Sequence, residues 1–282
     1  MKIKRSLAIA TLLVAAVAIL QTGRRGFGAD GTFAEINSAP GAFKDAVAHV
    51  QGFCCDEDAI YAVFLNKIYK LDWNGNVVKS AESVRHAGDP CLANEKLYVA
   101  MACDAKEAIH EYDLDLNLLR KIKLEEVETC DGIAFLDGKF YIGGSKDQAA
   151  NPNTPIFIYD EGFNFVKKEI VNFGVKTNWT TQSNMSWNGK IFCAFYIDKD
   201  NPKGSPRSIC IDKDCNILAK FQLDGSNGWC LAPGSRQSGD PNKPIFLVCK
   251  TYYVDKEPRA KFLWYEFDNE TLTFKNITME QK

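Results

Sequence analysis

Short hydrophobic runs separated by turn residues recur along most of the chain. The clearest example spans residues 130–171, where the runs IAFL, FYI, IFIY and FVKKEI are separated by the turn Leu136–Gly138, a loop, and the turn Asp160–Asn164. β-rich runs of this kind, bounded by Gly, Asp and Asn, are typical of strands joined by tight turns. The stretch therefore predicts one antiparallel sheet of four strands.

The closing turn of this unit recurs along the chain with an Asp at its first position and an Asn at its fifth. The copies are Asp72–Asn76, Asp113–Asn117, Asp160–Asn164 and Asp212–Asn216, and Asp268–Leu272 keeps the Asp without the Asn. Asp and Asn side chains bond the backbone of a turn, and Asn tolerates a positive φ. We therefore interpret these acids as structural and not as catalytic.

The first strand of every unit is expected to begin with a polar residue beside a small one. An aromatic residue marks the second strand of each unit: Tyr61, Tyr98, Tyr141, Phe192 and Phe246. Counting back from these aromatics, with Cys230 fixing the last unit, gives the openers Gln51-Gly52, Gly88-Asp89, Asp131-Gly132, Gln182-Ser183 and Asn227-Gly228. The aromatic stripe itself is expected to lie in the core.

Five such units, of roughly 40–55 residues each, predict an all-β fold: a five-bladed β-propeller of four-stranded antiparallel blades over residues 49–282. Residues 29–48 form a lead-in, and Phe33–Ile36 can add a strand to the last blade and close the ring. A β-sandwich is the alternative all-β architecture, but sandwiches do not require this periodicity.

The first 28 residues have the pattern of a secretory signal peptide. Lys2, Lys4 and Arg5 precede the apolar stretch Leu7–Leu20, as in the basic and hydrophobic regions of such signals. Arg24 and Arg25 are unusual near a cleavage site, so an uncleaved membrane anchor is the alternative. We expect a secreted, periplasmic or extracellular protein with no other membrane association.

The net charge of the chain bears on the class of partner that it can bind. Residues 1–28 hold five basic and no acidic residues, so the remainder has 29 basic against 36 acidic residues, a net charge of −7. An acidic chain disfavours a nucleic-acid partner.

The ten cysteines can form disulfides after export, with a pairing that the sequence leaves open. Cys54, Cys91 and Cys230 share one register and are expected as small buried side chains near the axis.

The phrases CDGIAFLDGKFYIGG and IFIYDEGFNFV resemble the repeat of NHL-type and related lactonase-like propellers. In that group a Gly-apolar opener, a DG turn and an apolar-Asp-x-x-Gly turn recur in each blade. The resemblance covers residues 49–275 as a repeat pattern and implies a propeller fold, without implying one function. Kelch, WD-repeat and sialidase Asp-box signatures are not apparent in the sequence.

The openers and the longest loops are expected to share one end of the molecule, around the axial mouth. Long loops on one face of a repeat protein usually line its binding surface. The predicted ligand-binding residues are Gln51, Asp89, Asp131, Trp179, Gln182, Tyr196, Asn227 and Tyr252. Flat aromatic rings beside amides and carboxylates suit the stacking and hydrogen bonding of a sugar. Carbohydrate or a protein partner is therefore the expected ligand.

A divalent metal is a further hypothesis for the same end. His49 and His86 occupy equivalent positions in adjacent units, two residues before the first and second openers. Two imidazoles with a carboxylate from Asp89 or Asp131 form a set that holds divalent metals in many proteins. The alternative is that both histidines simply lie in loops.

Two functional classes follow from these residues. The first is a secreted propeller that binds a ligand at the mouth. The second is a hydrolase of glycosides or lactones that uses Asp89 and Asp131, with or without the metal. Ala87–Pro90 is similar to the Asp-Pro opener of five-bladed furanosidase-type glycosidases, although it lies in the second unit and the first unit offers Gln51 instead.

Overall fold

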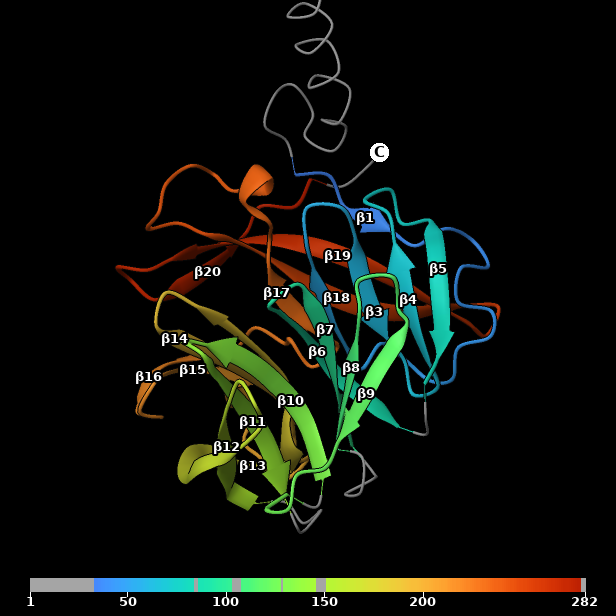
Figure 1. Ribbon diagram of the computed structural model, residues 1–282. Helices are drawn as coiled ribbons and strands as arrows, with labels where there is room; N and C mark the ends of the chain where they lie inside the picture. Colours follow the sequence, from blue (N-terminus) through green and yellow to red (C-terminus); the bar gives the residue numbers. More distant parts are fainter. Residues whose placement is uncertain (1–32, 84–85, 103–107, 128, 146–150, 280–282) are drawn as a thin grey trace, which may run out of the picture.

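The computed structural model describes residues 33–83, 86–102, 108–127, 129–145 and 151–279 (Figure 1). Within these residues the regular secondary structure is β-strand, apart from a single short 3₁₀ turn at Gly234–Arg236. The predicted signal segment, Cys103 and residue 128 lie outside the described part. No helix among the described residues is long and apolar enough to cross a membrane.

The first two sheets are four-stranded antiparallel meanders, each made from consecutive strands. One has the order β2 (Gly52–Cys55), β3 (Ile60–Val63), β4 (Lys67–Leu71) and β5 (Val77–Glu82). The other has the order β6 (Ala87–Ala93), β7 (Lys96–Met101), β8 (Ile109–Tyr112) and β9 (Leu118–Ile122). The prediction of all-β, four-stranded antiparallel sheets is confirmed by these elements.

The third sheet contains seven strands because one long strand belongs to two groups. Its order is β10 (Thr129–Leu136), β11 (Lys139–Ser145), β12 (Asn151–Asp160), β13 (Phe165–Trp187), β14 (Lys190–Ile197), β15 (Ser208–Asp212) and β16 (Ile217–Phe221). The N-terminal part of β13 pairs with β12, and its C-terminal part pairs with β14. The register of the second pairing shifts between Asn178 and Ser183.

The last sheet joins the two ends of the chain. It is built on β17 (Trp229–Leu231), β18 (Ile245–Val254) and β19 (Glu257–Asp268), and β19 pairs along one part with β20 (Thr273–Asn276) and along another with β1 (Ile36–Asn37). The expected addition of an N-terminal strand to the last sheet is thus confirmed at Ile36, which lies opposite Phe262.

The first strands of successive groups contact one another in a cycle. β2 contacts β6, β6 contacts β10, β10 contacts β13, β13 contacts β17, and β17 returns to contact β2. In Figure 1 these strands lie toward the middle of the molecule, with the outer strands such as β5 and β16 at its periphery.

The small residues of the openers explain how these strands approach so closely. A Cβ added at Gly52 would lie 2.2 Å from Asp89 Oδ1, one at Gly132 would lie 2.5 Å from Thr181 Oγ1, and one at Gly228 would lie 2.7 Å from the nitrogen of Phe53. Real Cβ atoms do not approach heavy atoms this closely. Glycine is therefore required at these three positions, where the start of one strand meets its neighbour.

The repeated Asp turns are structural, as predicted. In each of the four Asp-x-x-x-Asn copies the Asp carboxylate accepts hydrogen bonds from the backbone N–H two and four residues later and from the Asn side chain. The expectation that Asn supplies the positive φ is wrong: it falls one residue earlier, on Gly75, Leu116, Phe163 and Cys215. The Asn instead contributes its side-chain N–H₂ to the carboxylate.

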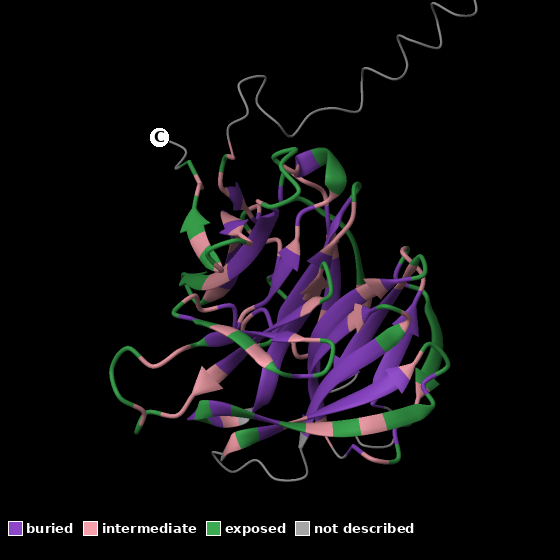
Figure 2. Ribbon diagram, turned by 90° about the vertical axis from the view of Figure 1, so that its left-hand side faces the viewer, coloured by how far each residue is buried: buried purple, intermediate pink, exposed green. Residues whose placement is uncertain are grey.

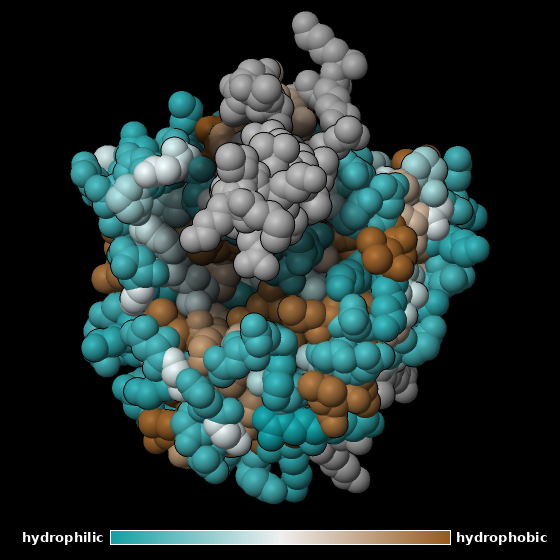
Figure 3. Space-filling view, turned by 45° about the horizontal axis from the view of Figure 1, so that its top comes forward, coloured by the Kyte–Doolittle hydropathy of each residue, from teal (hydrophilic) through white to brown (hydrophobic). Residues whose placement is uncertain are grey.

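The hydrophobic core lies between the sheets, where buried strand segments face each other (Figure 2). The five second-strand aromatics are all buried, as expected: Tyr61, Tyr98, Tyr141, Phe192 and Phe246. One cluster joins Phe53 of β2 to Phe262 of β19, with ring centroids 4.9 Å apart. On the face drawn in Figure 3, hydrophobic side chains gather in a band across the middle, and hydrophilic ones surround it with smaller hydrophobic patches among them. Because of the contact between Phe53 and Phe262, the core also packs the first sheet against the last.

Candidate functional site

Asp89 lies at the centre of the molecule and joins three of the central strands. It belongs to β6, is fully buried, and its Oδ2 accepts hydrogen bonds from the backbone nitrogens of Ile133 in β10 (3.2 Å) and Asn184 in β13 (2.7 Å). Burial raises the pKa of its carboxyl well above the ordinary value, against the opposing effect of these N–H donors. These contacts give Asp89 a structural role, out of reach of solvent.

A pair of glutamines lies across the cycle of central strands. Gln51, which precedes β2, and Gln182 in β13 are both buried, and Gln182 Nε2 donates to Gln51 Oε1 over 3.4 Å. Gln51 Nε2 in turn donates to the backbone carbonyl of His49, at 3.3 Å. Because β17 separates β13 from β2 in the cycle, this contact bridges strands that are not neighbours.

A second bridge joins the same two groups through His49 and Tyr196. The His49 Nε2 and the Tyr196 hydroxyl are 2.7 Å apart, and the two rings meet edge to face. Burial lowers the pKa of His49, and the nearby imidazole of His86 lowers it further. Burial also raises the pKa of Tyr196, with smaller contributions from the carboxyls of Asp224 and Asp131. At neutral pH this is therefore a bond between a neutral imidazole and a neutral phenol.

Asp131 lies near this bridge, and its carboxyl group is an unusually weak acid. It is 5 % exposed, and burial raises its pKa from 3.8 to about 7. Near neutral pH a substantial share of the Asp131 side chains is protonated, so the group can donate as well as accept a hydrogen bond. The protonation of Asp131, one of the two predicted catalytic acids, therefore changes in the physiological range.

The rim of the mouth is held by Asn227 and Thr251. Asn227 Oδ1 accepts from the backbone nitrogen of Thr251 (3.3 Å), and Thr251 Oγ1 accepts from the backbone nitrogen of Val50 (3.1 Å). These bonds fix the base of the β18–β19 hairpin to the start of the first unit. Thr251 is a residue that the repeat register alone did not identify.

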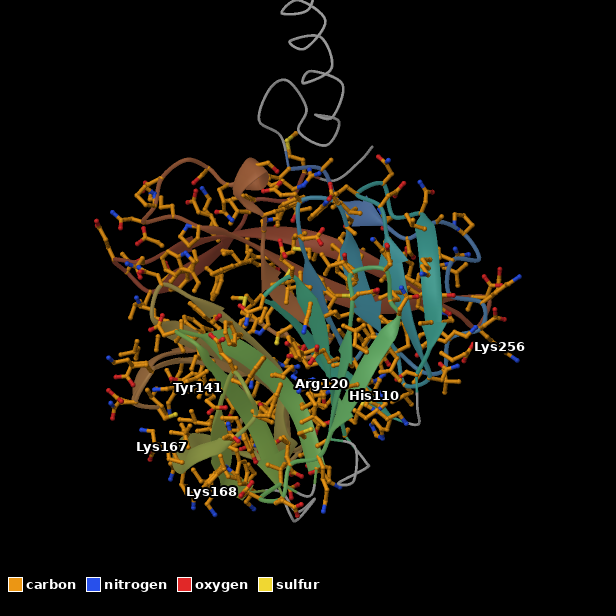
Figure 4. The ribbon with its side chains drawn as sticks, viewed as in Figure 1. His110, Arg120, Tyr141, Lys167, Lys168 and Lys256 are labelled. Atoms are coloured by element: carbon orange, nitrogen blue, oxygen red, sulfur yellow. The ribbon has the colours of Figure 1, made fainter. Side chains whose placement is uncertain are left out.

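Beyond Thr251 the β18–β19 hairpin extends past the mouth. Tyr252, Tyr253 and Val254 are 37 %, 56 % and 43 % exposed, and the turn places Asp255 and Lys256 at positive φ, as two-residue hairpin turns prefer. Figure 4 shows Lys256 at the edge of the molecule, away from the body of the sheets. The hairpin therefore presents an aromatic and aliphatic surface next to the polar mouth.

The structure brings together most, but not all, of the predicted site. Gln51, Gln182, His49, Tyr196 and Asp131 converge at the mouth, and Asn227 and Tyr252 lie at its rim through Thr251. The side chain of Trp179 lies outside the described part. His49 uses its Nε2 on Tyr196, and among the described residues no group of three or more His, Cys, Asp or Glu side chains is arranged to hold a metal. The predicted metal site at His49 and His86 therefore gains no support.

Comparison with known proteins leaves the family open. No family model matches the chain, and no curated protein matches it. Solved structures that resemble it include hydrazine synthase of Kuenenia stuttgartiensis (9 % identity, 80 % of this chain and 65 % of that chain, TM-score 0.47), a protein of unknown function from Bacteroides caccae (16 %, 61 % and 66 %, TM-score 0.44), and the WD40 domain of Neurospora crassa Pan2 (9 %, 83 % and 65 %, TM-score 0.41). This chain spans about two thirds of the length of each.

Proposed function

We propose that the chain is a five-bladed β-propeller that works as a binding scaffold for a protein partner. Support for five blades comes from β13, whose first part pairs with β12 and whose second part pairs with β14. Such a strand serves as the outer strand of one blade and the inner strand of the next. The seven-stranded sheet then counts as two blades, and the cycle of contacts from β2 through β17 counts five.

One observation carries the preference for a scaffold over a hydrolase: polar side chains close the axis at the mouth. Gln51 meets Gln182, and His49 meets Tyr196, across the cycle of central strands. Below them Asp89 is fully buried with its Oδ2 on two backbone N–H groups. Glycoside hydrolysis by two carboxyl groups requires both to face the scissile bond. A substrate at the mouth meets Asp131 before any other axial acid and does not reach Asp89.

The surface left for recognition is the rim, and its most exposed hydrophobic part is the β18–β19 hairpin. Tyr252, Tyr253 and Val254 project on an element whose base is fixed by Asn227 and Thr251. Tyrosines bury large areas at low entropic cost and are enriched at the centres of protein interfaces. A protein partner with an apolar pocket fits this hairpin. A carbohydrate at this rim is the second candidate, because the exposed Tyr252 follows Thr251, whose backbone nitrogen donates to the side-chain amide oxygen of Asn227.

Affinity capture with matched variants tests the proposal. The immobilised protein, its Tyr253→Ser variant and its Asp131→Asn variant are compared for captured proteins, for binding to a glycan array, and for turnover of glycoside and lactone substrates. We expect a captured protein that Tyr253→Ser loses and Asp131→Asn retains. Turnover that Asp131→Asn abolishes would establish the hydrolase instead. Glycan binding without a captured protein would make carbohydrate the ligand.

A further inference from the structure

At the opposite end of the axis from the mouth, two cysteines from the first and last units of the cycle lie in contact. Cys55 ends β2 and Cys230 lies in β17, and their sulfur atoms are 3.0 Å apart. Cys55 Sγ is also 3.4 Å from the carbonyl oxygen of Leu231. Both cysteines are free thiols in this structure. Among the nine cysteines that the structure describes, no other pair has a sulfur–sulfur contact of this kind.

The two side chains differ in accessibility. Cys230 is 6 % exposed, whereas Cys55 is half-buried. Both line an opening of about 130 Å³ near the axis, together with Cys54, Cys91 and Trp229. A small reagent that enters this opening meets Cys55 more readily than Cys230, because the side chain of Cys55 is the more exposed of the two.

We propose that Cys55 and Cys230 form a reversible disulfide that locks the first unit of the cycle to the last. A disulfide requires the sulfurs to approach to about 2.05 Å, so the side chains need to move by about 1 Å. β17 already contacts β2, and Gly228 lets the strands approach, since a Cβ there would lie 2.7 Å from the nitrogen of Phe53. The backbone therefore already holds the two residues as neighbours.

The oxidant for this disulfide is a second disulfide, such as oxidised glutathione. The thiolate of Cys55 attacks one sulfur of the oxidant, breaks its S–S bond, and releases one glutathione thiolate. Cys230 then loses its proton and attacks Sγ of Cys55, which releases the second glutathione thiolate. The two protein thiols lose two electrons, the oxidant gains them, and the two protons end on two molecules of reduced glutathione. Burial raises the pKa of Cys230 well above its ordinary value, so Cys230 is the less readily ionised thiol and follows as the resolving thiol, after Cys55 has reacted with the oxidant.

The position of the Cys55–Cys230 disulfide in the chain determines its effect on stability. Cys55 and Cys230 are 175 residues apart in sequence, so the bond closes a loop that spans most of the ring. Cross-links over long loops restrict the unfolded chain most. The seam between the first and last units is otherwise held by non-covalent contacts, among them the Phe53–Phe262 pair and the β1–β19 pairing. Oxidation would fasten the point where the ring would open.

The test uses the full chain equilibrated in oxidised or reduced glutathione, followed by alkylation, non-reducing peptide mapping and thermal melting. We expect a cross-linked peptide pair containing Cys55 and Cys230 in the oxidised sample. We also expect a melting temperature roughly 5–15 °C higher than in the reduced sample. Cys55→Ser and Cys230→Ser should each abolish the oxidised-minus-reduced difference, and Cys210→Ser, a buried cysteine of β15, should keep it.

Two results would overturn the proposal. One is an oxidised wild-type protein in which both thiols remain fully alkylatable or in which Cys230 is linked to another cysteine, such as Cys54. The other is a melting difference that persists in Cys55→Ser. The peptide map of the wild-type protein decides by itself if the Cys230→Ser variant does not fold. The result does not depend on what the rim hairpin binds.

Discussion

Asp89 Oδ2 accepts a hydrogen bond from the backbone nitrogen of Asn184 at 2.7 Å, linking strands β6 and β13, which lie 95 residues apart in sequence. The same oxygen accepts from the backbone nitrogen of Ile133 in β10. One carboxyl group therefore satisfies two buried N–H groups on two different strands. Buried N–H groups without a partner are costly, so this residue ties the centre of the fold together.

Removal of the Asp89 carboxyl group should destabilise the protein far more than its replacement by the neutral amide of Asn. Asp89→Ala leaves two buried N–H groups unpaired, and we expect it to lower the free energy of unfolding by about 3–5 kcal/mol. Asp89→Asn keeps an oxygen in place, and because burial already raises the pKa of Asp89, it should cost about 1–2 kcal/mol. Urea unfolding measures both. Equal effects of the two variants would show that the hydrogen bonds are not what Asp89 contributes.

Stability should depend on pH through Asp131. Its pKa is about 7 in the folded protein and 3.8 ordinarily, so between these values the folded state holds a proton that the unfolded chain has released. The contribution of Asp131 to the free energy of unfolding should therefore be fully present below about pH 4 and should fall as the pH rises toward 7, by up to about 1.4 kcal/mol per pH unit. Asp131→Asn removes this dependence.

The measurement is urea unfolding of wild type and Asp131→Asn at pH 5 and pH 8. From pH 5 to pH 8, the free energy of unfolding of Asp131→Asn should rise relative to that of the wild type by on the order of 2 kcal/mol. Asp115→Asn is the control, because the Asp115 side chain is 74 % exposed. A wild-type-to-variant difference that is the same at both pH values would contradict the burial of a protonated Asp131.

The close contact between the central strands β2 and β6 can be tested by substitution of Gly52. Gly52→Ala would place a Cβ 2.2 Å from Asp89 Oδ1 and 2.8 Å from Asp89 Cα, and we expect a loss of about 2–4 kcal/mol from overpacking. Gly234→Ala is the matched control, because its added Cβ meets nothing closer than 3.7 Å. That variant should stay within about 0.5 kcal/mol of wild type. A Gly52→Ala protein as stable as the control would mean that β2 and β6 are not packed as described.

The sequence predicted those parts of the fold that repeat. Each Asp turn is formed from residues at most four positions apart, and each opener is fixed by its distance from a second-strand aromatic, so both could be identified from local spacing. The positive φ was assigned to Asn because Asn tolerates it, but the turn places it one residue earlier, on Leu116 and its equivalents. Local spacing does not specify which residue of a turn takes the strained conformation.

The candidate site could be predicted only as a set of residues, without their pairing. The register brought Gln51, Asp131 and Gln182 to one end, and the structure places them there. Which side chains meet across the axis depends on the diameter of the ring and on rotamers, and the His49–Tyr196 and Gln51–Gln182 contacts depend on both. The Cys55–Cys230 contact, likewise, needs the closure of the ring and has no signature in the sequence.

The central claim is that recognition takes place on the β18–β19 hairpin beside a closed mouth. Its most direct test is titration calorimetry of the captured, purified partner with wild type, Tyr253→Ser and Phe165→Ser. Phe165 is a comparably exposed aromatic, 42 % against 56 % for Tyr253, and Figure 4 shows Lys167 of the same strand far from Lys256 of the hairpin. We predict that Tyr253→Ser weakens binding at least about tenfold, as loss of an interface anchor does, and that Phe165→Ser leaves the Kd unchanged. Equal affinity of all three proteins would contradict the claim.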